Sequence, residues 1–258
     1  MWRAIQSFST YYFQSKSKHG IHSPFVFAFV TKALENNLDP SFYNQLEIYK
    51  NTLSKDASVI SVTDFGAGSK VFKSNKRAIN RIAKYAGISK TKARLLQKII
   101  HYFQPKTILE IGTSLGIGTA AIKTVVKDAE LTTLEGCSET AAVALKYLKL
   151  QGFDNINCVI GEFSKTLPDV LKNKYYDMIY LDGNHRKNPT LEYFKFLLQA
   201  VTNDSFIIFD DIHWSKEMEE AWQEIKAHPR VKVSIDLYYM GIVFFRKEQV
   251  KQDFVIRY

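Results

Sequence analysis

The sequence predicts an α/β protein with a Rossmann-like, doubly wound, mostly parallel seven-stranded sheet, preceded by a mainly helical N-terminal segment. From Lys106 onward, short apolar runs alternate with stretches of helical periodicity, which is typical of βαβ units and a parallel sheet. The last two expected strands are joined only by residues 238–240, so they must form an antiparallel C-terminal pair. Residues 1–104 lack this alternation. We therefore expect a helical accessory segment at 1–104 and the sheet domain at 105–258.

Each expected element follows from its local pattern. The strands are expected at residues 107–111, 131–134, 156–160, 176–181, 206–209, 231–237 and 241–246, and the helices between them at 119–127, 139–150, 190–200 and 217–227. In the N-terminal segment, Ser23 and Pro24 are typical of an N-cap and a first helical residue, and this helix should run to about residue 36. Further helices are expected at 41–53, 76–85 and 89–103, with a long polar loop at 54–75.

Composition and charge narrow the class of protein. Hydrophobic residues make up 46% and charged residues 24% of the 258 residues, which excludes a disordered chain and a fibrous repeat. Lys and Arg outnumber Asp and Glu by 35 − 26 = 9, which favours polyanionic partners such as RNA or an anionic cofactor. The start of the chain lacks an apolar leader, and Cys137 and Cys158 suit a reducing compartment. We expect a cytoplasmic protein without membrane contact, and leave a homodimer open.

The clearest motif is ILEIGTSLGIGTA, residues 108–120, where an acid ends a strand and a glycine-rich turn opens a helix. Ligands of open α/β sheets bind outside the carboxyl ends of the strands, where glycines let the backbone approach them. A carboxylate at Glu110 would repel a pyrophosphate but suits an amino group, which favours S-adenosylmethionine (SAM) over NAD. Glu135 ends the next strand, where a carboxylate can accept hydrogen bonds from both ribose hydroxyls.

A second segment, VTDFGAGS at residues 62–69, also places an acid before two glycines. The run that follows it is polar and does not begin an apolar crossover helix. We interpret it as a structured loop of the N-terminal segment, placed against the site, and a second cofactor loop is the alternative.

The motif at residues 108–120 and the strand end at Glu135, together with YYDMIYLDGNH and FIIFDDIHW, resemble the class I SAM-dependent methyltransferases over residues 106–246. Within that class the chain is most similar to the catechol O-methyltransferase-like group and its bacterial relatives. The resemblance implies that Glu110 and the loop 112–118 hold the methionine part of SAM, that Glu135 binds its ribose, and that Gly161 and Glu162 lie near its adenine. The cofactor-binding set expected on this basis is Glu110, Gly112, Thr113, Ser114, Gly116, Gly118, Glu135, Gly161, Glu162 and Asp182.

Three carboxylates follow the fourth and fifth expected strands: Asp182, Asp210 and Asp211. Together they would repel one another unless they are protonated or bridged by a cation, and Mg²⁺ prefers such oxygen ligands. In the catechol-type family an acid and an Asp-Asn pair at these positions bind Mg²⁺, and Asp211 departs from that pattern. The alternative is that Asp210 and Asp211 cap the next helix or orient neighbouring side chains.

His185, three residues after Asp182, stands where the resemblance implies a lysine base. A histidine can also take a proton near neutral pH. We therefore expect His185 and Asp182 to be catalytic, with His213 as the rival base.

The expected function is SAM-dependent O-methylation of a small hydroxylated acceptor. One alternative is an RNA methyltransferase, favoured by the net charge and by a basic cluster. That cluster comprises Lys70, Lys73, Lys76, Arg77, Arg81 and Lys84. The other alternative is a non-catalytic SAM-binding protein, against which the acids at the expected strand ends argue.

Overall fold

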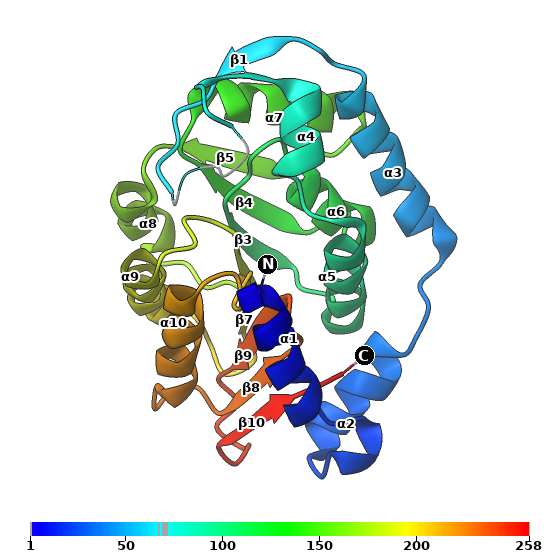
Figure 1. Cartoon of the computed structure of the whole chain (residues 1–258), viewed down its shortest axis with the longest axis vertical. Coiled ribbons are helices and arrows are strands. Elements are labelled where there is room, and N and C mark those ends of the chain that lie inside the picture. Colours follow the sequence, from blue (N-terminus) through cyan, green and yellow to red (C-terminus); the bar gives the residue numbers. More distant parts are fainter. Residues whose placement is uncertain (1, 67, 69–71, 258) are drawn as a thin grey trace.

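The computed structural model of the chain describes residues 2–66, 68 and 72–257. These residues form an eight-stranded sheet in the order β10-β8-β9-β7-β6-β3-β4-β5 (Figure 1). Its strands are β3 (Thr107–Ile111), β4 (Glu130–Glu135), β5 (Ile156–Ile160), β6 (Met178–Leu181), β7 (Phe206–Asp210), β8 (Val233–Asp236), β9 (Met240–Phe244) and β10 (Gln252–Val255). Strands β3 to β7 are parallel, and β9 is antiparallel to both β7 and β8. The predicted fold class is confirmed, with β10 added beside β8.

Successive side chains of the central strands point into two different cores. Ile108 and Ile208 belong to one apolar cluster, whereas Leu109 and Ile207 belong to the other. This is the alternation of a strand that is buried on both faces, and it explains why these strands read as continuous apolar runs.

Helices cover both faces (Figure 1). The first cluster joins the sheet to α2 (Pro24–Phe29), α3 (Pro40–Ser54), α4 (Ile79–Tyr85), α5 (Lys90–Phe103), α6 (Ile117–Val125) and α7 (Ser138–Leu150). The second cluster joins it to α8 (Phe163–Leu171), α9 (Lys187–Leu197) and α10 (Lys216–Ala227). Helices from before residue 104 thus share a core with the sheet, while the proposed boundary at residue 104 stays a prediction.

The N-terminal segment contains more regular structure than its sequence indicated. Helix α1 (Trp2–Gln14) was not expected, and it lies beside the β8–β10 edge, where Tyr11 Oη donates a hydrogen bond to the carbonyl of Ile256. The helix expected from Pro24 is present as α2, which ends at Phe29. The chain then continues as a π-helical stretch, Val30–Leu34. The expected loop 54–75 contains β1 (Val59–Ser61), which pairs antiparallel with β2 (Lys76–Ala78).

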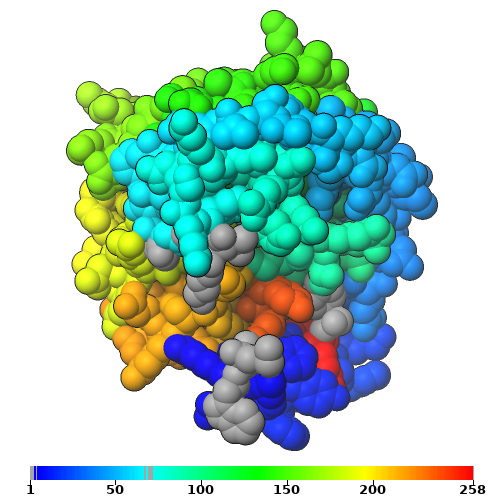
Figure 2. Space-filling view, turned by 45° about the horizontal axis from the view of Figure 1, so that its top comes forward, coloured from blue at the N-terminus to red at the C-terminus, as the bar shows by residue number. Residues whose placement is uncertain are grey.

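The β1–β2 ribbon and α4 lie at the carboxyl ends of the central strands. In Figure 2 their surface, in cyan, lies between the green surface of the α6–α7 region and the orange surface of the α10 region. None of the helices in the described ranges combines the length and apolarity needed to cross a membrane. Both cysteines are free thiols. Localisation in the cytoplasm stays a prediction.

Candidate active site

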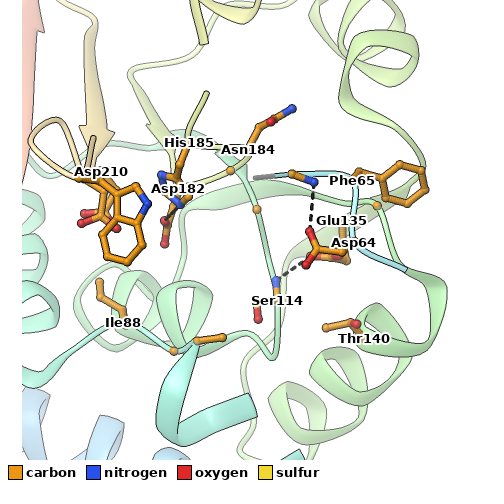
Figure 3. A pocket seen from close by; sticks show the side chains of 18 of the residues that line it. Asp64, Phe65, Ile88, Ser114, Glu135, Thr140, Asp182, Asn184, His185 and Asp210 are labelled. Carbon is orange, nitrogen blue, oxygen red and sulfur yellow. Dashed lines mark hydrogen bonds and ion pairs between the residues drawn. The ribbon is translucent and has the colours of Figure 1, made fainter. Parts of the chain in front are cut away.

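A cavity of about 830 Å³ opens at the carboxyl ends of β3, β4, β6 and β7, next to the point where the strand order reverses between β3 and β6. Open α/β sheets bind ligands at this point, and a volume of this size suits a small-molecule ligand. Figure 3 shows Ser114 and Glu135 at one end of the cavity and Asp182, His185 and Asp210 at the other.

The glycine loop after β3 forms part of the cavity wall. Gly112 has a φ of 106°, and a Cβ on it would lie 2.2 Å from the carbonyl oxygen of Asp182. Only glycine therefore allows the loop to pass this close to the end of β6. Gly112 and Ser114 line the cavity, whereas Thr113, Gly116 and Gly118 lie behind this wall, where Gly116 caps α6.

Glu110 lies beneath the glycine loop and not on the cavity wall. Its side chain is fully buried, and its Oε2 accepts hydrogen bonds from Thr119 (2.5 Å) and Thr133 (2.7 Å). Burial is the main cause that raises the pKa of Glu110 to about 8. Its Oε1 has no hydrogen-bond partner among the described residues and would lie 2.8 Å from a Cβ on Gly118. Glu110 thus lies beneath the loop, bonded to Thr119 and Thr133, and its expected contact with SAM stays a prediction.

Glu135 ends β4 and lines the cavity directly. One oxygen accepts a hydrogen bond from the backbone N–H of Ser114 at 2.7 Å (Figure 3). The other accepts from the backbone N–H of Cys137 at 2.9 Å. Burial raises its pKa, and these hydrogen bonds oppose the shift. The carboxylate is thus held in one orientation at the edge of the cavity, with lone pairs left for a ligand.

The loop after β5 reaches the same end of the cavity. Glu162 lines it and pairs with Lys165 at 2.8 Å, which lowers the pKa of Glu162. Gly161 has a φ of 149° and donates its N–H to the carbonyl of Glu135, so it continues the β4–β5 pairing behind the wall. Glu135 and Glu162 thus line one cavity, and their expected contacts with the ribose and the adenine stay predictions.

The second acid-glycine segment lies across this cavity. Phe65 packs closely on Gly136, since a Cβ on Gly136 would lie 2.6 Å from the Phe65 ring. Gly66 lies close to Asn184, since a Cβ on Gly66 would lie 3.2 Å from Asn184 Cα. Asp64 lines the cavity beside Glu135 and pairs with Arg77 at 3.4 Å (Figure 3). The interpretation as a structured loop against the site is in line with this geometry. Residues 67 and 69–71, which include Lys70 of the basic cluster, lie outside the described residues.

His185 and Asp182 form a pair at the other end of the cavity. His185 Nε2 lies 3.5 Å from Asp182 Oδ1, and Tyr180 Oη donates to Asp182 Oδ2 at 3.2 Å. Burial lowers the pKa of His185, but Asp182 and Asp211 raise it more, so the net shift is upward. Asn184 and His185 are both left-handed, with φ of 72° and 43°, and such paired strain is typical of functional loops.

One nitrogen of His185 is left for a ligand. Its Nδ1 is buried and has no hydrogen-bond partner among the described residues. A buried polar atom without a partner is costly, so this atom indicates a place where a bound molecule supplies the missing contact.

Lys92, which sequence reasoning missed, lies between the other two acids. Its Nζ is 2.8 Å from Asp210 Oδ2 and 2.5 Å from Asp211 Oδ1. Within the described ranges, no group of three His, Cys, Asp or Glu side chains is placed to hold a metal ion. The expected magnesium site therefore does not fit this arrangement as it stands, because an ammonium group already bridges two of its three carboxylates.

A signal for Lys92 is present in the sequence. It precedes Leu95, Leu96 and Ile99 at the i+3, i+4 and i+7 spacing of the buried face of α5. A lysine on a buried face needs an acidic partner, and the acids at the expected strand ends, Asp210 and Asp211, were candidates.

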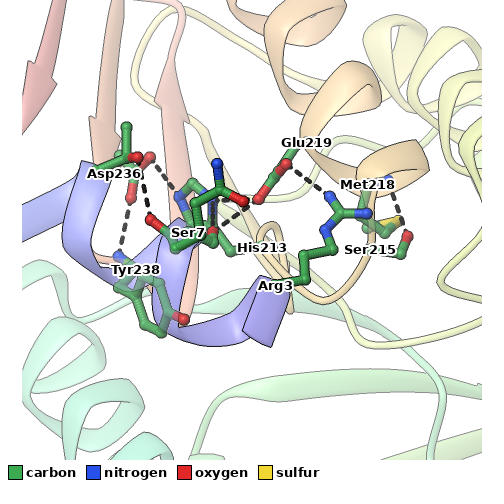
Figure 4. A network of polar contacts seen from close by, with 10 residues as sticks. Arg3, Ser7, His213, Ser215, Met218, Glu219, Asp236 and Tyr238 are labelled. Carbon is green, nitrogen blue, oxygen red and sulfur yellow. Dashed lines mark hydrogen bonds and ion pairs between the residues drawn. The ribbon is translucent and has the colours of Figure 1, made fainter. Parts of the chain in front are cut away.

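His213, the rival base, belongs to a different network (Figure 4). Its Nε2 lies 2.9 Å from Asp236 Oδ2, and its Nδ1 lies 3.3 Å from Ser7 Oγ and 3.4 Å from Glu219 Oε1. Arg3 of α1 pairs with the same Glu219 at 2.7 Å. Both ring nitrogens of His213 are thus engaged in joining α1 to α10 and β8, although the residue lines the cavity.

Comparison with known proteins agrees with the fold. A methyltransferase from Podospora anserina, solved with SAH bound, superposes with a TM-score of 0.59 at 15% identity, over 87% of this chain and 97% of that one. An O-methyltransferase from Bacillus cereus, solved in complex with SAH, gives 0.54 at 17% identity, over 85% and 97%. At such low identity these neighbours establish the fold alone, a mostly parallel α/β sheet with helices on both faces.

Sequence comparison adds the family. Residues 109–212 match the family described as "Methyltransferase domain". A catechol O-methyltransferase from Niastella koreensis is 30% identical over 129 residues, which are 48% of this chain and 58% of that protein. A transmembrane O-methyltransferase homolog from Rattus norvegicus is 32% identical over 80 residues, 30% of this chain and 31% of that protein. The matches span less than two thirds of each relative. Over the residues that they cover, these matches confirm the resemblance to methyltransferases seen in the sequence.

Proposed function

We propose that this chain is an enzyme that transfers the methyl group of SAM to an oxygen atom of a small hydroxylated acceptor. The observation that carries the proposal is a single cavity that has the fixed Glu135 carboxylate at one end and the Asp182–His185 pair at the other. The names of the relatives support the same reaction class.

The donor would be held by the end of the cavity that contains Glu135. Its carboxylate is oriented by the N–H groups of Ser114 and Cys137 and can accept hydrogen bonds from two neighbouring hydroxyls of a ribose. Glu162 and the loop 62–66 line the same end and would surround the adenosine part. Gly112, which allows the loop to pass close to the end of β6, lies on the cavity wall where the methionine part would be held.

The acceptor would approach from the end that contains His185. When bound, SAM supplies an electrophilic methyl group, which bonds to the acceptor oxygen as the bond to sulfur breaks. His185 takes the proton of the acceptor hydroxyl, and Asp182 orients the ring and stabilises the imidazolium that forms. The cavity contributes alignment and exclusion of water. No step of this proposal passes through a metal.

The direct test is transfer of labelled methyl from SAM to a panel of small hydroxylated molecules, with total RNA in parallel. Label in a small molecule, and its loss in Glu135→Ala, is the expected result. Label only in RNA would support the RNA alternative, with a falling rate at higher salt. Tight SAM binding without transfer to any acceptor would support the non-catalytic alternative.

A further inference from the structure

The side chain of Lys92 reaches from the first turn of α5 to the ends of the central strands. Ser89 caps this helix by accepting a hydrogen bond from the backbone N–H of Lys92, which fixes where the side chain begins. The side chain is only 13% exposed, and its two partners, Asp210 and Asp211, are 3% and 26% exposed. This is a buried, charge-neutralising contact and not a surface ion pair.

The contact joins the N-terminal segment to the reacting end of the cavity. Asp210 ends β7 and Asp211 follows it, while Asp182 follows the neighbouring strand β6 and faces His185. Without a cation, three carboxylates so close together would repel one another. Lys92 supplies one positive charge where the sequence had suggested a divalent metal.

Electrostatics are in line with a permanent ammonium. Burial lowers the pKa of Lys92, but Asp210, Asp211 and Asp182 raise it more, and the net shift is strongly upward. Burial and Asp182 raise the pKa of Asp210 well above its usual value, and Lys92 opposes that shift. The raised pKa of Lys92 keeps it an ammonium at neutral pH.

We propose that the Lys92 ammonium is a built-in cation that replaces a divalent metal at the acceptor end of the cavity and holds the acids around His185 in place. This inference rests on the proposed function, which places the acceptor at the end of the cavity that contains His185. Lys92 is a positioning residue, because its Nζ acts through Asp210 and Asp211. The enzyme would then need no added metal, and its acceptor would not have to chelate one through two adjacent oxygens.

Metal binding tests the inference without any assay of activity. Binding of Mn²⁺ to the whole chain is followed by electron paramagnetic resonance and calorimetry. The parent protein should bind no Mn²⁺ in the cavity. Stoichiometric binding to the parent that is lost in Asp210→Asn would overturn the inference, because the metal would then displace Lys92.

Substitution of the lysine provides the second arm. Lys92→Met keeps the length of the side chain and removes its charge, and Lys90→Met is the matched control. Lys90 lies in the same turn, is 57% exposed and pairs only loosely, at 3.5 Å, with Glu47. With chelator present, Lys92→Met should lose about 10²-fold in kcat, the scale of a misplaced catalytic group, and Lys90→Met should not. Lys92→Arg should recover part of the loss.

Two further results separate this inference from the proposed function. Added Mg²⁺ should raise the activity of Lys92→Met and leave that of the parent unchanged. Full activity of Lys92→Met in chelator would refute the positioning role. If Lys92→Met does not fold, the Mn²⁺ measurement on the parent still decides the matter. Failure of SAM to bind the parent would instead remove the proposed function, whatever the metal result.

Discussion

Replacing His185 with alanine should remove the proton acceptor and leave the donor site intact. His185 lies at the end of the cavity opposite Glu135, and its ring contacts Asp182 but none of the residues that hold the Glu135 carboxylate. We therefore expect kcat to fall while the affinity for SAM changes by no more than a factor of about two to three. This corresponds to about 0.5 kcal/mol, the usual limit for a substitution that removes no important contact.

The size of the fall follows from the geometry. A positioned general base contributes about 10²–10⁴-fold. The 3.5 Å separation between His185 Nε2 and Asp182 Oδ1 is long for a hydrogen bond, so Asp182 orients the ring only loosely. We therefore expect the lower half of the range, about 10²–10³-fold, which corresponds to about 3–4 kcal/mol of barrier.

The pH dependence identifies the same group. Only neutral His185 can accept a proton, and its pKa is raised above the ordinary value of about 6.5. The rate should therefore fall about tenfold per pH unit below that raised pKa. Asp182→Asn removes the acid that raises the pKa most, so the acidic limb should move to lower pH.

The assay is single-turnover transfer of labelled methyl across a pH series, with SAM affinity measured by calorimetry. His101→Ala is the control, because His101 is exposed on α5 and its ring packs on Phe42, which does not line the cavity. If His185→Ala turns over at the parent rate with an unchanged acidic limb, the base assignment is wrong.

Three further predictions concern the donor site and the N-terminal helix. Glu135→Gln leaves one backbone N–H facing an amide nitrogen, so SAM affinity should fall by about 1–3 kcal/mol in calorimetry. Glu139→Gln is the control and should not change the affinity, because the Glu139 carboxylate contacts Ser61 outside the cavity. Gly112→Ala must move the chain away from Asp182, so denaturant unfolding should show a loss of about 1–3 kcal/mol together with weaker SAM binding; normal values for both would contradict the close approach. His213→Ala removes the contact to Oδ2 of the buried Asp236, whose Oδ1 keeps its bond from the Tyr238 N–H, and should lower the Tm by the equivalent of about 1–3 kcal/mol, while kcat falls less than in His185→Ala.

The sheet domain could be predicted from the sequence because its strands are buried on both faces. Such strands give largely apolar runs, and the run at 107–111 coincides with β3. The short connection between β8 and β9 made their antiparallel pairing predictable too. The positions of Glu135, Glu162, Asp182 and His185 at one cavity follow from the same rule, since parallel strands end at one edge of the sheet.

The elements that were missed lack such local signals. In β10 the four residues include Gln252 and Asp253 and are exposed or half-buried, because the strand lies at the sheet edge. Helix α8 contains Pro168, which speaks against a helix when only the sequence is considered. Helix α1 has no acidic residue in its first turn and no basic residue in its last, and it is held by tertiary contacts through Arg3 and Ser7.

Lys92 was missed for a different reason, since its partners are more than a hundred positions away in the chain. Local patterns report which face of a helix is buried, but not which strand end that face reaches. The donor end of the cavity is built largely from β3, β4 and β5 and their loops, so its chemistry is visible in short motifs. The acceptor end also needs Lys92 of α5, which comes from a different part of the sequence. A change in the N-terminal segment can therefore alter the charge and shape that the acceptor meets while every donor motif stays intact. For this reason the motifs identify the methyl donor far better than they identify the molecule that receives the methyl group.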